Sequence, residues 1–110
     1  MPLPSLKQQF AELIALSCTQ PALDLPNRPL IERLAGWLGD LGFACEIQDI
    51  APGKANLLAT YGSGPGGLVL AGHSDTVPFD AALWQSDPLR LSERDNRWYG
   101  LGACDMKGFS

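Results

Sequence analysis

Two stretches of the chain repeat apolar residues at intervals of three and four, the spacing that places side chains on one face of a helix. The first covers residues 5–16, and Ser5 with Gln8 three residues later forms a capping-box pattern at its start. The second begins near Asn27, carries Pro29 in its first turn and ends before Gly42. The expected inward-facing residues are Leu6, Phe10, Leu13 and Ile14, and then Leu30, Ile31, Leu34, Trp37, Leu38 and Leu41.

Shorter stretches have the patterns of strands. Residues 43–50 alternate apolar and polar side chains, residues 51–54 form a turn, and residues 56–61 predict a further strand. Residues 67–71 are nearly all apolar, which predicts a strand buried on both faces. An Asp-Asn pair within residues 89–99 predicts a β-hairpin. Helices mixed with a buried strand indicate an α/β fold rather than a helix bundle or a β-sandwich.

The composition of the chain argues against nucleic acid and membranes as partners and favours the cytoplasm as its location. A chain of 110 residues with net charge −4 predicts one small domain without a basic patch, which argues against nucleic acid. No apolar run is long enough to span a bilayer, and no secretory signal is visible. Cys18, Cys45 and Cys104 form no C-x-x-C pair, so reduced thiols in the cytoplasm are expected.

A glycine-rich stretch at residues 62–67 satisfies the G-x-G-x-x-G pattern of dinucleotide-binding sites. That motif needs a helix after the glycines, because the helix N-terminus holds the pyrophosphate. Here a strand pattern follows, so we interpret the stretch as a connection between strands and expect no nucleotide cofactor.

The only histidine of the chain, His73, follows the apolar stretch directly, and Asp75 lies two residues later. In an extended backbone these two side chains point to the same side, so His73 can bind a metal while Asp75 orients its ring. H-x-D is a short and common pattern, however. A hydrogen-bonded histidine at a strand end, with Asp75 in a turn, is the alternative interpretation.

Asp105 lies in a second candidate segment, residues 98–108, with glycines on both sides. One carboxylate can bridge two cations, as two-metal hydrolysis requires. From the residues alone, an N-cap for a helix that starts at Met106 is the more favoured role for Asp105, and the two roles are compatible. We expect Cys104 to be a small buried side chain behind this loop and the aromatic residues Trp84, Trp98 and Tyr99 to fill the core.

Taken together, residues 72–78 and 100–108 resemble the paired signature of the M20 metallopeptidase family. The resemblance implies a catalytic domain with a mixed α/β sheet and flanking helices that binds two divalent metal ions, usually zinc and in some cases cobalt. It also implies that His73 is a metal ligand, that Asp75 is the catalytic carboxylate that steadies His73, and that Asp105 bridges both metals. The peptide bond after Asp105 is then expected to be cis.

The same resemblance implies that residues 1–110 are the N-terminal portion of the catalytic domain of a longer, homodimeric protein. The general-base glutamate, the other metal ligands and a small dimerisation domain are then expected beyond Ser110, so that this chain alone is inactive. The expected substrate is a small N-acylated amino acid, with hydrolysis of the acetyl amide of N2-acetyl-L-ornithine as the leading hypothesis. The alternatives are another M20 amidohydrolase, such as a succinyl-diaminopimelate desuccinylase or a carboxypeptidase, and a non-catalytic truncated fragment.

Overall fold

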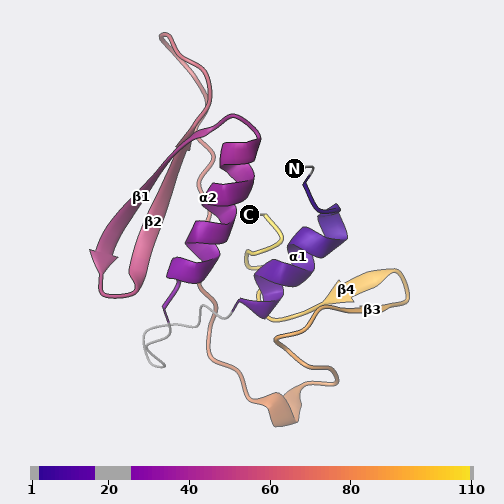
Figure 1. Cartoon of the computed structure of the whole chain (residues 1–110). Coiled ribbons are helices and arrows are strands. Elements are labelled where there is room, and N and C mark those ends of the chain that lie inside the picture. Colours follow the sequence, from indigo (N-terminus) through magenta and orange to yellow (C-terminus); the bar gives the residue numbers. More distant parts are fainter. Residues whose placement is uncertain (1–2, 17–25, 110) are drawn as a thin grey trace.

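The computed structural model describes residues 3–16 and 26–109 of the chain, so Cys18 lies outside the described residues. Two helices and two β-hairpins form most of the regular structure (Figure 1). In chain order the elements are α1 (Leu6–Ala15), α2 (Arg28–Asp40), β1 (Ala44–Ala51), β2 (Lys54–Thr60), the short 3₁₀ helix η2 (Ala81–Leu83), β3 (Ser92–Arg94) and β4 (Arg97–Tyr99).

The predicted capping box begins α1. The Ser5 hydroxyl accepts a hydrogen bond from the Gln8 amide at 3.3 Å, and the Gln8 side-chain oxygen accepts one from the Ser5 amide at 2.9 Å. These bonds satisfy amide groups that have no partner within the helix. Leu13 and Ile14 are buried as expected, whereas Leu6 is largely exposed, because it lies in the first turn, at the end of the helix.

Helix α2 receives its N-terminal cap from the turn between β1 and β2. The carbonyl of Gly53 accepts hydrogen bonds from the amides of Asn27 (3.0 Å) and Arg28 (3.3 Å). The Asn27 side chain does not cap the helix but binds both backbone groups of Ala55, accepting from its amide at 2.8 Å and donating to its carbonyl at 2.9 Å. The β1–β2 hairpin is therefore fixed to the start of α2 by two backbone hydrogen bonds and by the side chain of Asn27.

The core lies where the two helices meet. Leu13 of α1 packs with Leu30 and Trp37 of α2, and Leu3, Leu16 and Leu34 cover this cluster. At the rim, the Arg33 guanidinium donates two hydrogen bonds to the Glu12 carboxylate, at 2.6 and 3.0 Å. The predicted apolar faces of both helices supply this core, but Leu41, which was expected to face inward, is 53% exposed at the C-terminal end of α2.

The strands form two separate two-stranded antiparallel sheets, β1–β2 and β3–β4. The α/β content is confirmed, but in the described part of the chain the hairpins do not join into the mixed sheet that was expected. Asp95 and Asn96 form the β3–β4 turn with positive φ angles of 53° and 60°, as the Asp-Asn pair predicted.

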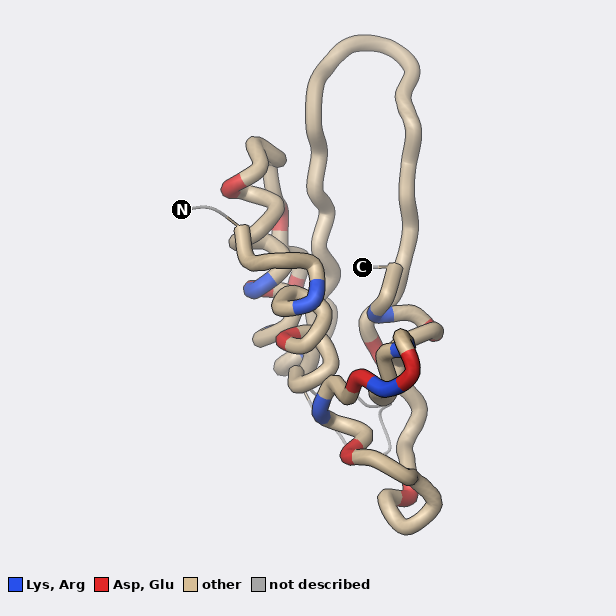
Figure 2. Tube along the Cα trace, turned by 90° about the vertical axis from the view of Figure 1, so that its right-hand side faces the viewer, with Lys and Arg blue, Asp and Glu red and all other residues tan. Residues whose placement is uncertain are grey.

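The prediction of a buried strand at residues 67–71 is wrong for this structure. No described strand pairs with this segment, and Leu68, Val69 and Leu70 are 85%, 88% and 74% exposed. A strand buried on both faces needs neighbouring strands and a covering layer, and none of the described elements supplies them. Figure 2 shows the long connection after β2 projecting from the body, and residues 55–74 carry no charged side chain.

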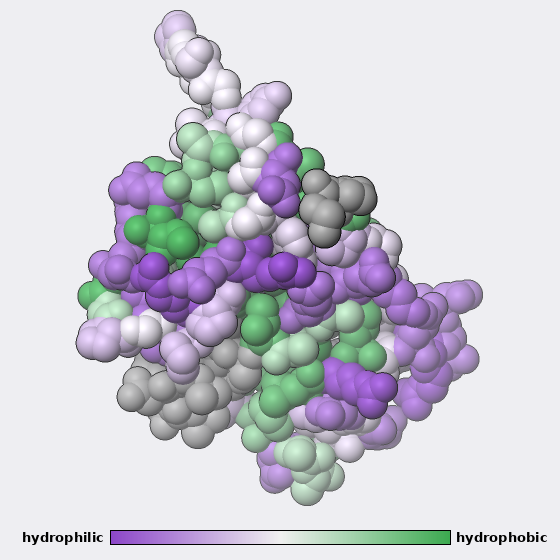
Figure 3. All heavy atoms as spheres, viewed as in Figure 1, coloured by the Kyte–Doolittle hydropathy of each residue, from purple (hydrophilic) through white to green (hydrophobic). Residues whose placement is uncertain are grey.

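Parts of the surface are apolar. Figure 3 shows hydrophobic side chains reaching the surface in several places, and the connection after β2 extends beyond the rest of the molecule. Among the described helices, none is long and apolar enough to cross a membrane.

We predict that Asn27→Ala lowers the free energy of unfolding by about 2 kcal/mol, because it leaves two backbone groups of the buried Ala55 without their side-chain partner. Urea unfolding followed by circular dichroism measures this change. Asn56→Ala is the matched control, since Asn56 is an exposed asparagine on β2, next to Ala55. An equal effect of the two substitutions would show that the Asn27 bonds contribute nothing specific.

Candidate metal centre

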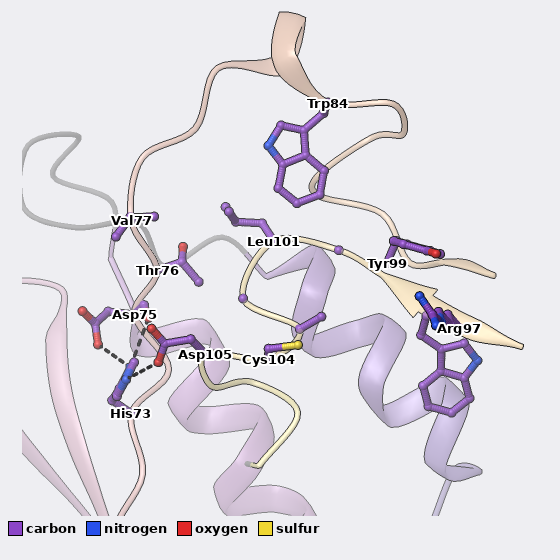
Figure 4. Close-up of a pocket in the computed structure, with 14 residues that line it drawn as sticks. His73, Asp75, Thr76, Val77, Trp84, Arg97, Tyr99, Leu101, Cys104 and Asp105 are labelled. Carbon is purple, nitrogen blue, oxygen red and sulfur yellow. Dashed lines mark hydrogen bonds and ion pairs between the residues drawn. The ribbon is translucent and has the colours of Figure 1, made fainter. Parts of the chain in front are cut away.

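His73 lies in the connection between β2 and η2, with its ring directed toward Asp75 (Figure 4). Its Nδ1 atom is 3.0 Å from the Asp75 carboxylate oxygen Oδ1 and 3.2 Å from the Asp75 backbone carbonyl. Nδ1 therefore faces two acceptors, which favours a proton on this nitrogen. The arrangement predicted for His73 and Asp75 from their i, i+2 spacing is present in the structure.

The second ring nitrogen of His73 faces Asp105, from a distant part of the chain. Its Nε2 atom is 3.1 Å from Asp105 Oδ1. The Asp105 side chain is 86% exposed and the His73 side chain 48% exposed, so solvent and small ions reach both groups. The two segments that the sequence singled out thus converge at one point.

Asp105 is carried by a series of turns over residues 101–109, in which Lys107 donates its amide to the Gly102 carbonyl at 2.9 Å. The Asp105–Met106 peptide bond is cis, as expected. The prediction that Asp105 caps a helix is wrong, because residues 101–109 form turns and no helix begins at Met106. Backbone hydrogen bonds within the turns are formed here instead of the regular hydrogen bonds of an α-helix.

Cys104 is exposed rather than buried behind the loop, so that prediction is also wrong. Met106 is partly buried instead, and Lys107 is fully buried. Cys104, like Cys45, is a free thiol.

An open hollow of about 1080 Å³ extends from His73 and Asp105 toward the β3–β4 hairpin (Figure 4). Trp84, Trp98 and Tyr99, which we expected in the core, are only partly buried and line this hollow. Trp98 and Tyr99 directly precede Gly100, and this adjacency was a sequence signal for the surface that our assignment of the aromatic residues to the core did not use. The remaining lining residues are Asp75, Thr76, Val77, Arg97, Gly100, Leu101, Gly102, Ala103 and Cys104.

The donor atoms present fit part of a metal site. An imidazole nitrogen and a carboxylate oxygen are ordinary zinc ligands, and two ligands of one tetrahedral zinc ion are about 3.3 Å apart. The 3.1 Å separation of His73 Nε2 and Asp105 Oδ1 is close to this value. The described residues contain no group of three or more potential ligands, whereas a tetrahedral zinc ion would need four.

Close packing at Gly102 holds the two segments together. A Cβ atom at Gly102 would lie 2.5 Å from Thr76 Cγ2 and 3.6 Å from Lys107 Cδ, so the glycine is enclosed between both segments. Thr76 itself is buried, and its hydroxyl has no hydrogen-bond partner among the described residues. The distance between His73 and Asp105 therefore depends on the absence of a side chain at residue 102.

We predict that Gly102→Ala separates the two segments and weakens any binding of Zn²⁺ at the candidate site by at least about tenfold, a loss typical for displaced metal-site geometry. Its φ angle of +76° adds backbone strain, on the order of 1 kcal/mol. Gly62→Ala is the control, because Gly62 has a similar φ of +86° but open space around it. Isothermal titration with Zn²⁺ and urea unfolding measure both effects, and equal results for the two variants would contradict the packing argument.

Comparison with known proteins shows that this chain is similar to a protein family and to several curated relatives. Residues 69–110 match the model of peptidase family M20/M25/M40. The chain is 53% identical to the acetylornithine deacetylase of Vibrio campbellii and 54% identical to that of Pectobacterium carotovorum, in each case over 99% of this chain. It is 54% identical to the acetylornithine deacetylase of Photorhabdus laumondii over 97% of this chain.

The chain spans about 30% of the length of the curated relatives it matches. The family match covers His73, Asp75 and Asp105, the three residues that converge in the structure. Nearly the whole chain is therefore similar to a part of an acetylornithine deacetylase, and its residues 69–110 carry the pattern of the M20 peptidases.

Proposed function

We propose that this chain supplies part of the metal centre of an amidohydrolase that converts N2-acetyl-L-ornithine and water to L-ornithine and acetate. The observation that carries the proposal is the convergence of His73, Asp75 and Asp105 from two segments of the chain. The names of the relatives, which are about half identical to this chain, support the substrate.

In this proposal each of the three residues has a separate task. His73 and Asp105 each present a ligand atom, Nε2 and Oδ1, to the same point. Asp75 accepts the Nδ1 proton of His73, which fixes the tautomer that leaves the Nε2 lone pair available. The second oxygen of Asp105 is free to reach a second ion, because this side chain is almost fully exposed.

Two divalent ions, zinc or cobalt, would act as Lewis acids on an amide carbonyl and make water a nucleophile near neutral pH. The carboxylates of Asp75 and Asp105 add negative charge around the imidazole, which favours cation binding over binding of an anion. In the overall reaction the carbon–nitrogen bond of the acetyl amide breaks, the hydroxyl group of water is added to the carbonyl carbon of the acetyl group, and the remaining proton of water goes to the leaving amine nitrogen.

Residues 67–71, Cys45 and Cys104 lie outside the three-residue cluster, and each of them fits the proposed enzyme. The exposed apolar residues 67–71 have the composition of a central strand, and we propose that they join a mixed sheet in the complete catalytic domain. The free thiols of Cys45 and Cys104 fit a reducing, cytoplasmic location.

We predict that Asp105→Ala in the full-length protein lowers the metal content and reduces kcat by more than about 100-fold, because a ligand is removed outright. Asp75→Asn keeps the side-chain shape but replaces the carboxylate that accepts the His73 Nδ1 proton, so kcat is expected to fall about 10–100-fold. Asp95→Asn in the β3–β4 turn is the control, since asparagine tolerates its positive φ. Metal analysis and steady-state kinetics test this, and an Asp105→Ala variant with normal metal content and turnover would refute the proposal.

We also predict that the full-length protein hydrolyses N2-acetyl-L-ornithine with a higher kcat/KM than N-succinyl-L,L-diaminopimelate. The measurement is ornithine or diaminopimelate release in parallel assays with added zinc or cobalt. A preference for the succinylated substrate would keep the metal centre but overturn the proposed substrate.

A further inference from the structure

Lys107 is buried, with 1% of its surface exposed, although it carries a charged ammonium group. Burying an ammonium group is costly unless hydrogen bonds compensate for the lost water. Lys107 Nζ donates a hydrogen bond to the backbone carbonyl of Leu16 at 2.8 Å. The other two lysines of the chain, Lys7 and Lys54, are not fully buried.

The carbonyl that accepts this hydrogen bond lies at the C-terminal end of α1, a position that favours a cation. Leu16 is the residue that caps the C-terminal end of α1, where carbonyl groups have no partner within the helix. The helix dipole also concentrates partial negative charge at that end, which attracts a cation. The ammonium group of Lys107 therefore binds α1 through both a hydrogen bond and the helix dipole.

Lys107 is also tied to the turn that carries Asp105. Its amide donates to the Gly102 carbonyl at 2.9 Å, and its side chain passes close to Gly102, which in turn packs on Thr76. Lys107 thus joins the end of α1 to the Asp105 turn, and this turn contacts the segment that holds His73 and Asp75 through the packing of Gly102 on Thr76.

We propose that Lys107 is a positioning residue for Asp105, and that its anchored ammonium group holds the Asp105 turn against His73. This inference rests on the proposed role of Asp105 as a metal ligand. Lys107 touches neither the metal nor the substrate in this scheme, because its ammonium group points to α1 and away from the hollow.

The test compares Lys107→Met with wild type in the full-length protein. Methionine keeps an unbranched apolar stem and removes the ammonium group. In the metal-free protein we expect faster amide hydrogen exchange within residues 100–109, where three backbone bonds hold the turn, and unchanged exchange in the β1–β2 hairpin. Hydrogen-exchange mass spectrometry resolves the two regions.

In the same variant we expect Co²⁺ to bind about tenfold more weakly and kcat to fall about tenfold, with KM within about twofold of wild type. Lys7→Met is the matched control, because it removes an exposed lysine from α1 that pairs with Glu93. This control is expected to bind Co²⁺ and turn over as wild type does.

A Lys107→Met variant that melts at a lower temperature but keeps wild-type Co²⁺ affinity and kcat would overturn the proposal, because the lysine would then be merely structural. If Lys107→Met does not fold, Lys107→Gln replaces it, since its amide nitrogen ends one atom short of Nζ. Wild-type exchange and Co²⁺ affinity in Lys107→Gln would equally overturn the proposal. If wild type itself neither binds Co²⁺ nor hydrolyses the amide, the metal-centre proposal fails, and hydrogen exchange in the metal-free variants still decides whether Lys107 holds the turn.

Discussion

The close packing of residues 100–109 against α1 and against residues 73–76 is the constraint on which the candidate site depends. Gly100 lies against the fully buried Ile14, and Gly102 lies against Thr76. Added side chains at these glycines would meet their neighbours at 2.9 and 2.5 Å, too short for ordinary contact. His73 and Asp105 come within 3.1 Å of each other only because these segments approach so closely.

Features that depend on a few neighbouring residues could be predicted from the sequence. The Ser5–Gln8 capping box, the Asp95-Asn96 turn and the extent of α2 were predicted correctly, because the chemistry that fixes them lies within a few residues of the chain. The pairing of His73 with Asp75 belongs to the same group, since an i, i+2 spacing in an extended segment brings both side chains together.

Features that depend on distant partners could not be predicted in this way. The strand expected at residues 67–71 requires neighbours on both sides, and the described elements place two isolated hairpins elsewhere. The side-chain directions around Asp105 were also missed: Cys104 is exposed and Lys107 buried, the reverse of what polarity alone suggests. Only the family resemblance, not the spacing of residues, indicated that Asp105 joins His73, because nothing local relates the two segments.

The turn over residues 101–109 carries a buried lysine, Lys107, two residues after an exposed carboxylate, Asp105. The Asp105 side chain is 86% exposed, so burial of that side chain does not hold it in place. Its position has to come from neighbours that are buried, and Lys107, two residues away, reaches the end of α1. A lysine suits this place better than an apolar residue, because its long stem packs in the interior while its ammonium group donates a hydrogen bond to the Leu16 carbonyl at the end of α1. The stability of α1 and the geometry of the candidate metal centre are therefore linked through one side chain.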